Sequence, residues 1–179
     1  MKIQYASDLH LEFAENGSYI KHNPLPITGD ILILAGDIGY LGDANYSRHP
    51  FWDWVADNYQ QVIACMGNHE FYKQSDIAAF ENGYCLEIRP NVHSYYNGIV
   101  HIGDIDIIVS TLWGHIPLKE AYFTESVISD FRRILFKGEL LTFADFNNEC
   151  ERCSDFIRKA VRESNAKHKV VVTHHVPSF

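Results

Sequence analysis

The chain has 179 residues, of which 46% are hydrophobic, and its formal net charge at pH 7 is −8. This length and apolar fraction are enough for one domain with a hydrophobic core, which we expect to span residues 1–179. The 15 Lys and Arg residues are scattered, so the sequence disfavours nucleic-acid binding, which requires a concentrated basic surface.

The distribution of apolar residues and cysteines narrows the class of protein further. No run approaches the roughly 20 apolar residues that a membrane-spanning helix needs, and no signal peptide precedes the first predicted strand. The four cysteines are irregularly spaced, which argues against a disulfide framework and fits a reducing compartment. We therefore expect a cytoplasmic protein that does not contact a membrane.

Four short apolar runs predict strands that are buried on both faces of a sheet. Each run is rich in β-branched or aliphatic side chains. The runs are residues 3–6, 31–35, 62–66 and 170–172. Helix-like segments alternate with them, which favours an α/β architecture.

Between these strands the sequence predicts one loop and one crossover helix. Residues 11–29 combine an Asn-Gly pair with two prolines, which is typical of a loop. Residues 51–59 carry aromatic and aliphatic side chains at helical spacing and follow Pro50, a suitable first-turn residue.

The middle of the chain predicts antiparallel strands. Asn97-Gly98 is a strong turn signal between residues 92–96 and 99–103, which we interpret as a hairpin. A further strand follows at residues 105–113. Antiparallel strands should therefore join a largely parallel core.

The strongest helix prediction covers residues 142–164, where apolar side chains recur every three or four positions. Thr142 and Asp145 fit an amino-terminal cap. Cys150 and Cys153 have the Cys-x-x-Cys spacing, but no second pair accompanies them and both lie on the apolar stripe. We expect these cysteines to pack in the core and not to bind zinc or act in redox chemistry.

Each of the four buried strands is followed by a short polar motif. The motifs are Ser7-Asp8-Leu9-His10, Gly36-Asp37, Gly67-Asn68-His69-Glu70 and Thr173-His174-His175. Any one of them could be a helix cap, a turn or a core histidine. Ligands of open α/β sheets collect beyond the carboxyl ends of the strands, so the four together predict a metal site. Its mixed oxygen and nitrogen donors suit manganese, iron, zinc or a mixed pair.

The side chains at these strand ends offer complementary chemistry. Asp8 and His10 are two residues apart and can turn toward one point above the sheet. Asp37 follows a glycine, which permits close approach to an ion, and its two oxygens could bridge two cations. Asn68 would supply a neutral oxygen that leaves a bound metal strongly Lewis acidic.

The histidines beside these ligands suggest contacts with substrate. His69 should project toward a substrate oxygen, with Glu70 accepting a hydrogen bond from its ring. His174 completes the ligand set, and His175 is the alternative if the strand register shifts by one. His115 follows the strand that we expect to end at residue 113, where it would line the pocket or touch substrate.

In order and spacing, these motifs resemble the successive blocks of the calcineurin-like metallophosphoesterase superfamily over essentially the whole chain. The resemblance implies a layered αββα sandwich of two mixed β-sheets flanked by helices. It also implies two divalent metal ions, with the aspartate of the second motif as the bridge between them and these five ligands: Asp8, His10, Asp37, Asn68 and His174. His69 would be the catalytic histidine, protonating or stabilising the leaving oxygen while a metal-bridging hydroxide attacks phosphorus.

The sequence departs from the family pattern in one respect. The family's final Gly-His-x-His block is missing, and the other Gly-His pair, Gly114-His115, has Pro117 where the second histidine would stand. That pair also precedes His174, so its order is wrong. We expect the domain to be incomplete at its carboxyl end, beyond Phe179, and its metal affinity to be reduced accordingly.

These observations predict a metal-dependent phosphoesterase that hydrolyses a small phosphomonoester or phosphodiester. The alternative is a catalytically silent relative that serves as a binding or scaffold domain, although the presence of His69 argues against it. A nuclease is a third possibility that the net charge disfavours. The walls of the substrate pocket should come from residues 11–29, 39–49 and 113–125.

Overall fold

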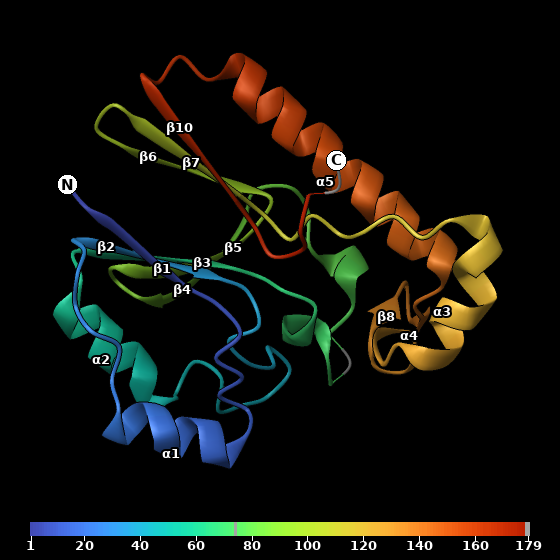
Figure 1. Cartoon of the computed structure of the whole chain (residues 1–179), viewed down its shortest axis with the longest axis horizontal. Coiled ribbons are helices and arrows are strands. Elements are labelled where there is room, and N and C mark those ends of the chain that lie inside the picture. The colour runs from blue at the N-terminus through green and yellow to red at the C-terminus, as the bar shows by residue number, and fades with distance from the viewer. Residues whose placement is uncertain (74, 178–179) are drawn as a thin grey trace.

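The computed structural model describes residues 1–73 and 75–177, in which two mixed β-sheets are stacked (Figure 1). The expectation about the chain's end at Phe179 lies outside these residues. In the five-stranded sheet, β4 is antiparallel to β5 and the other neighbours are parallel. Its strands, in spatial order, are β1 (Ile3–Ala6), β2 (Ile31–Ala35), β3 (Gln61–Cys65), β5 (Val92–Tyr96) and β4 (Tyr84–Arg89).

The second sheet has three strands, with β7 in the centre. β10 is parallel to β7 and β6 is antiparallel to it. The strands, in spatial order, are β10 (His168–Thr173), β7 (Ile105–Ser110) and β6 (Gly98–Ile102). A separate two-stranded ribbon pairs β8 (Leu135–Phe136) with β9 (Glu139–Leu140).

Helices cover the outer faces of both sheets. In Figure 1, α1 and α2 lie below the five-stranded sheet and α5 lies above the three-stranded one, so the predicted αββα class is confirmed. The helices are α1 (Ala14–His22), α2 (Pro50–Asn58), α3 (Ala121–Val127), α4 (Asp130–Arg133) and α5 (Phe143–Glu163). Short 3-10 turns occur at η1 (His69–Phe71), η2 (Ile77–Ala79) and η3 (Leu118–Glu120).

Strand β2 shows why the core strands are apolar throughout. Successive strand residues point to opposite faces of a sheet. Ile31 and Ile33 belong to the cluster between the two sheets, whereas Leu32 and Leu34 pack with Trp52 of α2 on the other face. Both faces of β2 are therefore buried, as its continuous aliphatic sequence predicted. The same prediction was wrong for β1 and β10, because both lie at the edge of a sheet and keep exposed side chains such as Tyr5 and Val171.

Helix α5 agrees with its prediction. Thr142 Oγ1 accepts a hydrogen bond from the Asp145 N–H at 3.2 Å, and the Asp145 carboxylate accepts one from the Thr142 N–H at 3.1 Å, which forms a capping box. Cys153 is fully buried and Cys150 is half-buried, and both are free thiols in a hydrophobic cluster, as expected. No helix in the described part of the chain is both long enough and apolar enough to cross a bilayer.

The prediction of a loop over residues 11–29 was wrong, because α1 occupies Ala14–His22. The Asn16-Gly17 pair that suggested a turn lies within the helix. Asn16 Nδ2 donates to the Leu9 carbonyl at 3.1 Å, which fastens the helix to the preceding strand end, and α1 also packs against α2. These tertiary contacts outweigh the weak helix propensity of asparagine and glycine.

The predicted hairpin at Asn97-Gly98 was also wrong, although a turn is present. Asn97 has a positive φ of 49°, as an Asn-Gly turn predicts. The strands on either side do not pair with each other: β5 pairs with β4, and β6 pairs with β7 in the other sheet. The turn therefore carries the chain from one sheet to the next. Strand β4, which sequence analysis did not predict, takes the place of the expected partner.

Candidate metal centre

The polar motifs that follow β1 and β2 have unusual backbone geometry. Asp8, His10 and Asp37 have φ angles of 56°, 48° and 56°, in the left-handed region that residues other than glycine seldom occupy. Two hydrogen bonds hold the segments together, from the Asp8 N–H to the Gly36 carbonyl and from the His10 N–H to the Asp37 carbonyl, each at 3.0 Å. Strain of this kind persists where the surrounding structure enforces it, and it is concentrated at functional sites.

One set of donors lies at the ends of β1 and β2. Asp8, His10 and Asp37 each place one ligand atom within 4.8 Å of the others. His10 Nε2 is 3.8 Å from Asp37 Oδ2. Two carboxylates and one imidazole in this arrangement could hold a divalent cation.

A second set faces the other oxygen of Asp37. His174 Nε2 lies 3.1 Å from Asn68 Oδ1 and 3.4 Å from Asp37 Oδ1. His174 Nδ1 lies 2.9 Å from the Ala35 carbonyl oxygen, which can only accept, so the ring donates there. In the neutral ring, Nε2 then has a lone pair aimed at two oxygen atoms. Three acceptors this close require a cation among them.

Protonation can supply that positive charge when no metal does. Burial lowers the pKa of His174, but the hydrogen bond and the negative charge of Asp37 outweigh that effect and raise it. The donor set therefore fits a divalent metal ion, which would replace the proton.

Two glycines make room for this close approach. A Cβ atom at Gly36 would lie 2.4 Å from His174 Nδ1, and one at Gly67 would lie 2.2 Å from Asp37 Oδ1. Neither distance is tolerable for a carbon atom. The glycines that precede Asp37 and Asn68 in the motifs are thus required by the packing of the donors themselves.

Asp130 of α4 fixes the orientation of the Asn68 amide, and sequence analysis missed it. Its Oδ1 accepts hydrogen bonds from Asn68 Nδ2 at 3.0 Å and from the Tyr72 hydroxyl at 2.6 Å. The amide nitrogen of Asn68 is therefore engaged, and its oxygen faces His174. Asp130 lies in a helix that follows none of the predicted strands, so no sequence signal connects it with the site.

Glu70 does not have the role that sequence analysis gave it. Its carboxylate is fully buried and accepts hydrogen bonds from four backbone N–H groups, and none from the His69 ring. The donors and their distances are Gly67 at 2.7 Å, Ile38 at 2.8 Å, Asp37 at 3.0 Å and Gly39 at 3.3 Å. The prediction failed because η1 begins at His69, and in a 3-10 turn adjacent side chains point in different directions.

The carboxylate beside His69 is Glu12, which sequence analysis also missed. Glu12 Oε1 lies 2.8 Å from His69 Nδ1 and 3.1 Å from His10 Nδ1, and its side chain is only 3% exposed. An ionised carboxylate only accepts hydrogen bonds, so both rings carry their proton on Nδ1. Both Nε2 atoms are then directed toward Asp37 Oδ2, at 3.8 Å for His10 and 4.0 Å for His69. The available signal was the position of Glu12 two residues after a candidate ligand.

The His69 ring is held among other rings. It stacks on Tyr72 with centroids 4.4 Å apart, meets the His10 ring edge-on at 4.4 Å, and lies 5.9 Å from Tyr40. Burial lowers the pKa of His69, but the hydrogen bond to Glu12 and the charge of Asp37 raise it above its ordinary value. A positioned imidazole with a raised pKa suits general-acid chemistry.

His175 and His115 form no hydrogen bond with the candidate ligands among the described residues, although the His175 ring lies 5.1 Å from that of His174. The His175 ring packs against Trp113 and Phe146, with centroids 5.5 and 6.0 Å apart, and burial lowers its pKa. His115 is exposed. Of the two histidines that follow β10, His174 is therefore the one that faces the other donors.

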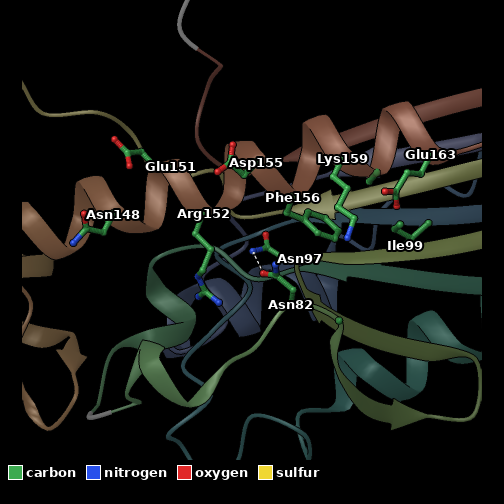
Figure 2. Close-up of a pocket in the computed structure, with 12 residues that line it drawn as sticks. Asn82, Asn97, Ile99, Asn148, Glu151, Arg152, Asp155, Phe156, Lys159 and Glu163 are labelled. Atoms are coloured by element: carbon green, nitrogen blue, oxygen red, sulfur yellow. Dashed lines mark hydrogen bonds between the residues drawn. The ribbon is translucent and has the colours of Figure 1, made fainter.

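A cavity of 780 Å³ lies elsewhere, beside α5. Figure 2 shows Glu151, Asp155 and Lys159 along the helix and the hydrogen-bonded pair Asn82 and Asn97 below it. None of the candidate metal ligands lines this cavity. The candidate chemistry is thus concentrated at the strand ends.

Comparisons with known proteins agree with this geometry. The family model for calcineurin-like phosphoesterases matches residues 1–179. A solved structure with the same fold is a phosphopantetheinyl hydrolase from Mycobacterium tuberculosis, with a TM-score of 0.61 and 18% sequence identity over 98% of this chain and 68% of that one. No curated protein matches the sequence significantly. The strand-end cluster therefore stands in a recognised family fold, and the chain belongs to the calcineurin-like phosphoesterase family.

Proposed function

We propose that this protein is a metal-dependent phosphoesterase with two divalent cations. The observation that carries the proposal is the position of Asp37 between two donor sets. Its Oδ1 faces His174 at 3.4 Å and its Oδ2 faces His10 at 3.8 Å. A carboxylate placed in this way could bind one cation with each oxygen.

The remaining donors divide between the two positions. Asp8 and His10 would complete the shell at Oδ2, and Asn68 and His174 would complete the shell at Oδ1. When bound, the cations would act as Lewis acids that activate a water molecule and neutralise phosphoryl oxygens. Oxygen and nitrogen donors of this kind suit manganese, iron or zinc.

His69 would assist departure of the leaving group. Glu12 Oε1 accepts the Nδ1 proton of the ring at 2.8 Å, so Nε2, which is directed toward Asp37 Oδ2 at 4.0 Å, is the atom that would meet the leaving oxygen. In the imidazolium form, Nε2–H could donate a proton to the leaving oxygen, and the nearby carboxylates favour that form. Tyr72, stacked on the ring, restricts its rotation.

We propose a small phosphomonoester or phosphodiester as the substrate. The similarity to a phosphopantetheinyl hydrolase supports a phosphoester substrate in general.

The test combines metal analysis with hydrolysis of 4-nitrophenyl phosphate and bis(4-nitrophenyl) phosphate. We expect about two metal ions per chain after loading with Mn²⁺, and turnover of one ester that chelation abolishes and metal restores. The matched variants are Asp37→Asn and Asp57→Asn, the second of which removes an exposed carboxylate of α2. Only the first should lose activity and metal. Bound metal without turnover of either ester would favour a catalytically silent binding domain and contradict the proposal.

A further inference from the structure

A hollow lies behind two tyrosines that contact the proposed catalytic histidine, His69. It has a volume of 320 Å³ and is lined by Tyr40, Tyr72, Lys73, Arg132 and Arg133. Tyr72 forms one of its walls and also stacks on the His69 ring at 4.4 Å. Tyr40 lies 5.9 Å from His69 and 5.7 Å from Tyr72. The hollow and the proposed site therefore share an aromatic wall.

The hollow has three cationic side chains, although the chain as a whole has a net charge of −8. Lys73 Nζ forms an ion pair with Asp43 at 2.7 Å, so its charge is largely balanced. Within residues 1–73 and 75–177, Arg132 donates only to the backbone carbonyls of Ser126 and Val127, at 2.8 and 3.5 Å. These oxygens carry no net charge, so the Arg132 guanidinium is uncompensated.

Arg133 is also uncompensated. Its guanidinium lies 5.3 Å from the centre of the Tyr72 ring, and no carboxylate among residues 1–73 and 75–177 forms an ion pair with it. Stacking on an aromatic face orients a guanidinium while leaving its edge free to donate hydrogen bonds. Two exposed guanidiniums without acidic partners therefore face one hollow.

These arginines are held in position relative to the candidate metal ligands. Arg132 and Arg133 lie on α4, two and three residues after Asp130. Asp130 is 5% exposed and accepts hydrogen bonds from Asn68 and from Tyr72. The same carboxylate thus ties α4 to a candidate metal ligand and to the wall of the hollow. Pre-organisation of this kind lowers the entropic cost of binding.

We propose that this hollow binds a second phosphate, carried by the leaving group of the substrate. The inference rests on the proposed phosphoesterase function, in which His69 marks the leaving-group side. Planar guanidinium groups match the oxygens of a phosphate and form charge-assisted hydrogen bonds with them. The substrate class is therefore a phosphoester whose leaving group bears another phosphate, and the tyrosine rings flank the segment between the two.

The test compares two substrates that differ only in the second anionic group. Phenyl phosphate lacks it, and 4-(phosphonomethyl)phenyl phosphate carries a non-hydrolysable dianion on the same leaving group. If the enzyme hydrolyses only diesters, each compound is replaced by its methyl ester, in which the methyl group is attached to the phosphate that the enzyme cleaves. We expect kcat/KM to be at least about tenfold higher for the phosphonate substrate, since hydrogen bonds to charged groups have this magnitude.

Arg133→Gln should reduce the ratio of the two kcat/KM values by about tenfold. Lys137→Gln is the matched control, because Lys137 lies on the nearby β8–β9 turn, packs over Phe136, and does not line the hollow. It removes the same charge and should leave the ratio unchanged. Circular dichroism would show that both variants are folded.

Failure of the two proposals can be distinguished. If phenyl phosphate is hydrolysed but the phosphonate group gives no advantage, or if Lys137→Gln lowers the ratio as much as Arg133→Gln, the second-phosphate site is wrong. If neither substrate is hydrolysed, the phosphoesterase function is contradicted. Calorimetric measurement of the binding of the two compounds to metal-loaded protein then tests whether the hollow binds the second anionic group. Equal affinities would overturn it, and tighter, Arg133-dependent binding of the phosphonate would support it.

Discussion

The polar cluster beneath α5 and the cluster at the strand ends both bury charged side chains, but they differ in how their hydrogen bonds are completed. Beneath α5, Glu149 accepts from the Tyr96 hydroxyl at 2.6 Å and from Arg152 at 2.5 and 3.0 Å. Arg152 also donates to the Phe80 carbonyl at 3.0 Å, and Trp113 donates to Tyr96 at 3.0 Å. Donors and acceptors alternate throughout this cluster.

At the strand ends, acceptors face acceptors. Asn68 Oδ1 and Asp37 Oδ1 lie 3.1 and 3.4 Å from His174 Nε2, and the buried Glu12 Oε2 has no hydrogen-bond partner among the described residues. Buried polar groups are normally paired, so acceptors that converge with too few donors indicate a place for a cation. The closed cluster stabilises the fold, and the open one is available for chemistry.

The largest expected effect comes from the open cluster. Asp37→Asn keeps an oxygen that can accept the His69 N–H bond but removes the charge that both donor sets share. We expect kcat/KM for the aryl ester to fall about a thousandfold, equivalent to about 4 kcal/mol of transition-state stabilisation. The thermal midpoint of metal-free protein should fall only modestly, because the variant loses the ion pair with protonated His174 but keeps the hydrogen-bond acceptor. A loss of metal-free stability comparable to the loss of activity would contradict the distinction between the clusters.

The closed cluster should show the opposite behaviour. Glu149→Leu would leave the Tyr96 hydroxyl and the half-buried Arg152 without their acceptor. We expect the free energy of unfolding, measured with urea, to fall by about 2 kcal/mol, a value below that of fully buried pairs because Arg152 is partly exposed. Turnover per folded molecule should stay near the original value, and a specific loss of kcat would show that this cluster also serves catalysis.

Glu12→Gln tests the carboxylate that accepts hydrogen bonds from both His10 and His69. A glutamine has similar shape, but it lacks the charge that holds both Nδ1 protons, so we expect kcat to fall about tenfold with little change in KM. Glu15→Gln, which alters an exposed glutamate of α1, is the control. A rise in KM at unchanged kcat would assign Glu12 to substrate binding instead.

The smallest effect concerns a partly exposed closed cluster, in which Asp106 bonds to Ser164 at 2.6 Å and to His101 at 2.6 Å. These hydrogen bonds lower the pKa of Asp106 below its ordinary value. A depressed carboxyl pKa contributes stability above the unfolded-state value, near pH 4, and that stability is lost as the pH falls through the folded-state pKa. Asp106→Asn should therefore be less stable than the original protein in urea at pH 7, and the difference should narrow at pH 3.

Sequence and structure agree where the information is local. Asp8, Asp37, Asn68 and His174 each come within three residues of the end of a strand, and the carboxyl ends of these strands meet at one side of the molecule, so a pattern in each short segment predicted where its side chain would lie. The apolar stripe and capping box of α5 are similarly local.

The misses have a common physical cause, which is dependence on tertiary contacts. Asp130 reaches Asn68 from 62 residues away, and Glu12 reaches His69 from 57 residues away. The Asn97 turn was evident from sequence, but the partner of each strand is decided by which sheet buries its side chains. Tyr96 and Val100, on either side of that turn, are buried in different clusters.

The four N–H bonds to Glu70 also bear on how metal ions enter the site. The loops after β2 and β3 are braced against one buried carboxylate, through Asp37, Ile38, Gly39 and Gly67. Amide hydrogens in surface loops usually exchange quickly with solvent, but these should exchange as slowly as those of the neighbouring strands, even in metal-free protein. The loops would thus be rigid before a cation binds. The rate of metal uptake would be set by ligand deprotonation and ion dehydration, and not by ordering of the loops.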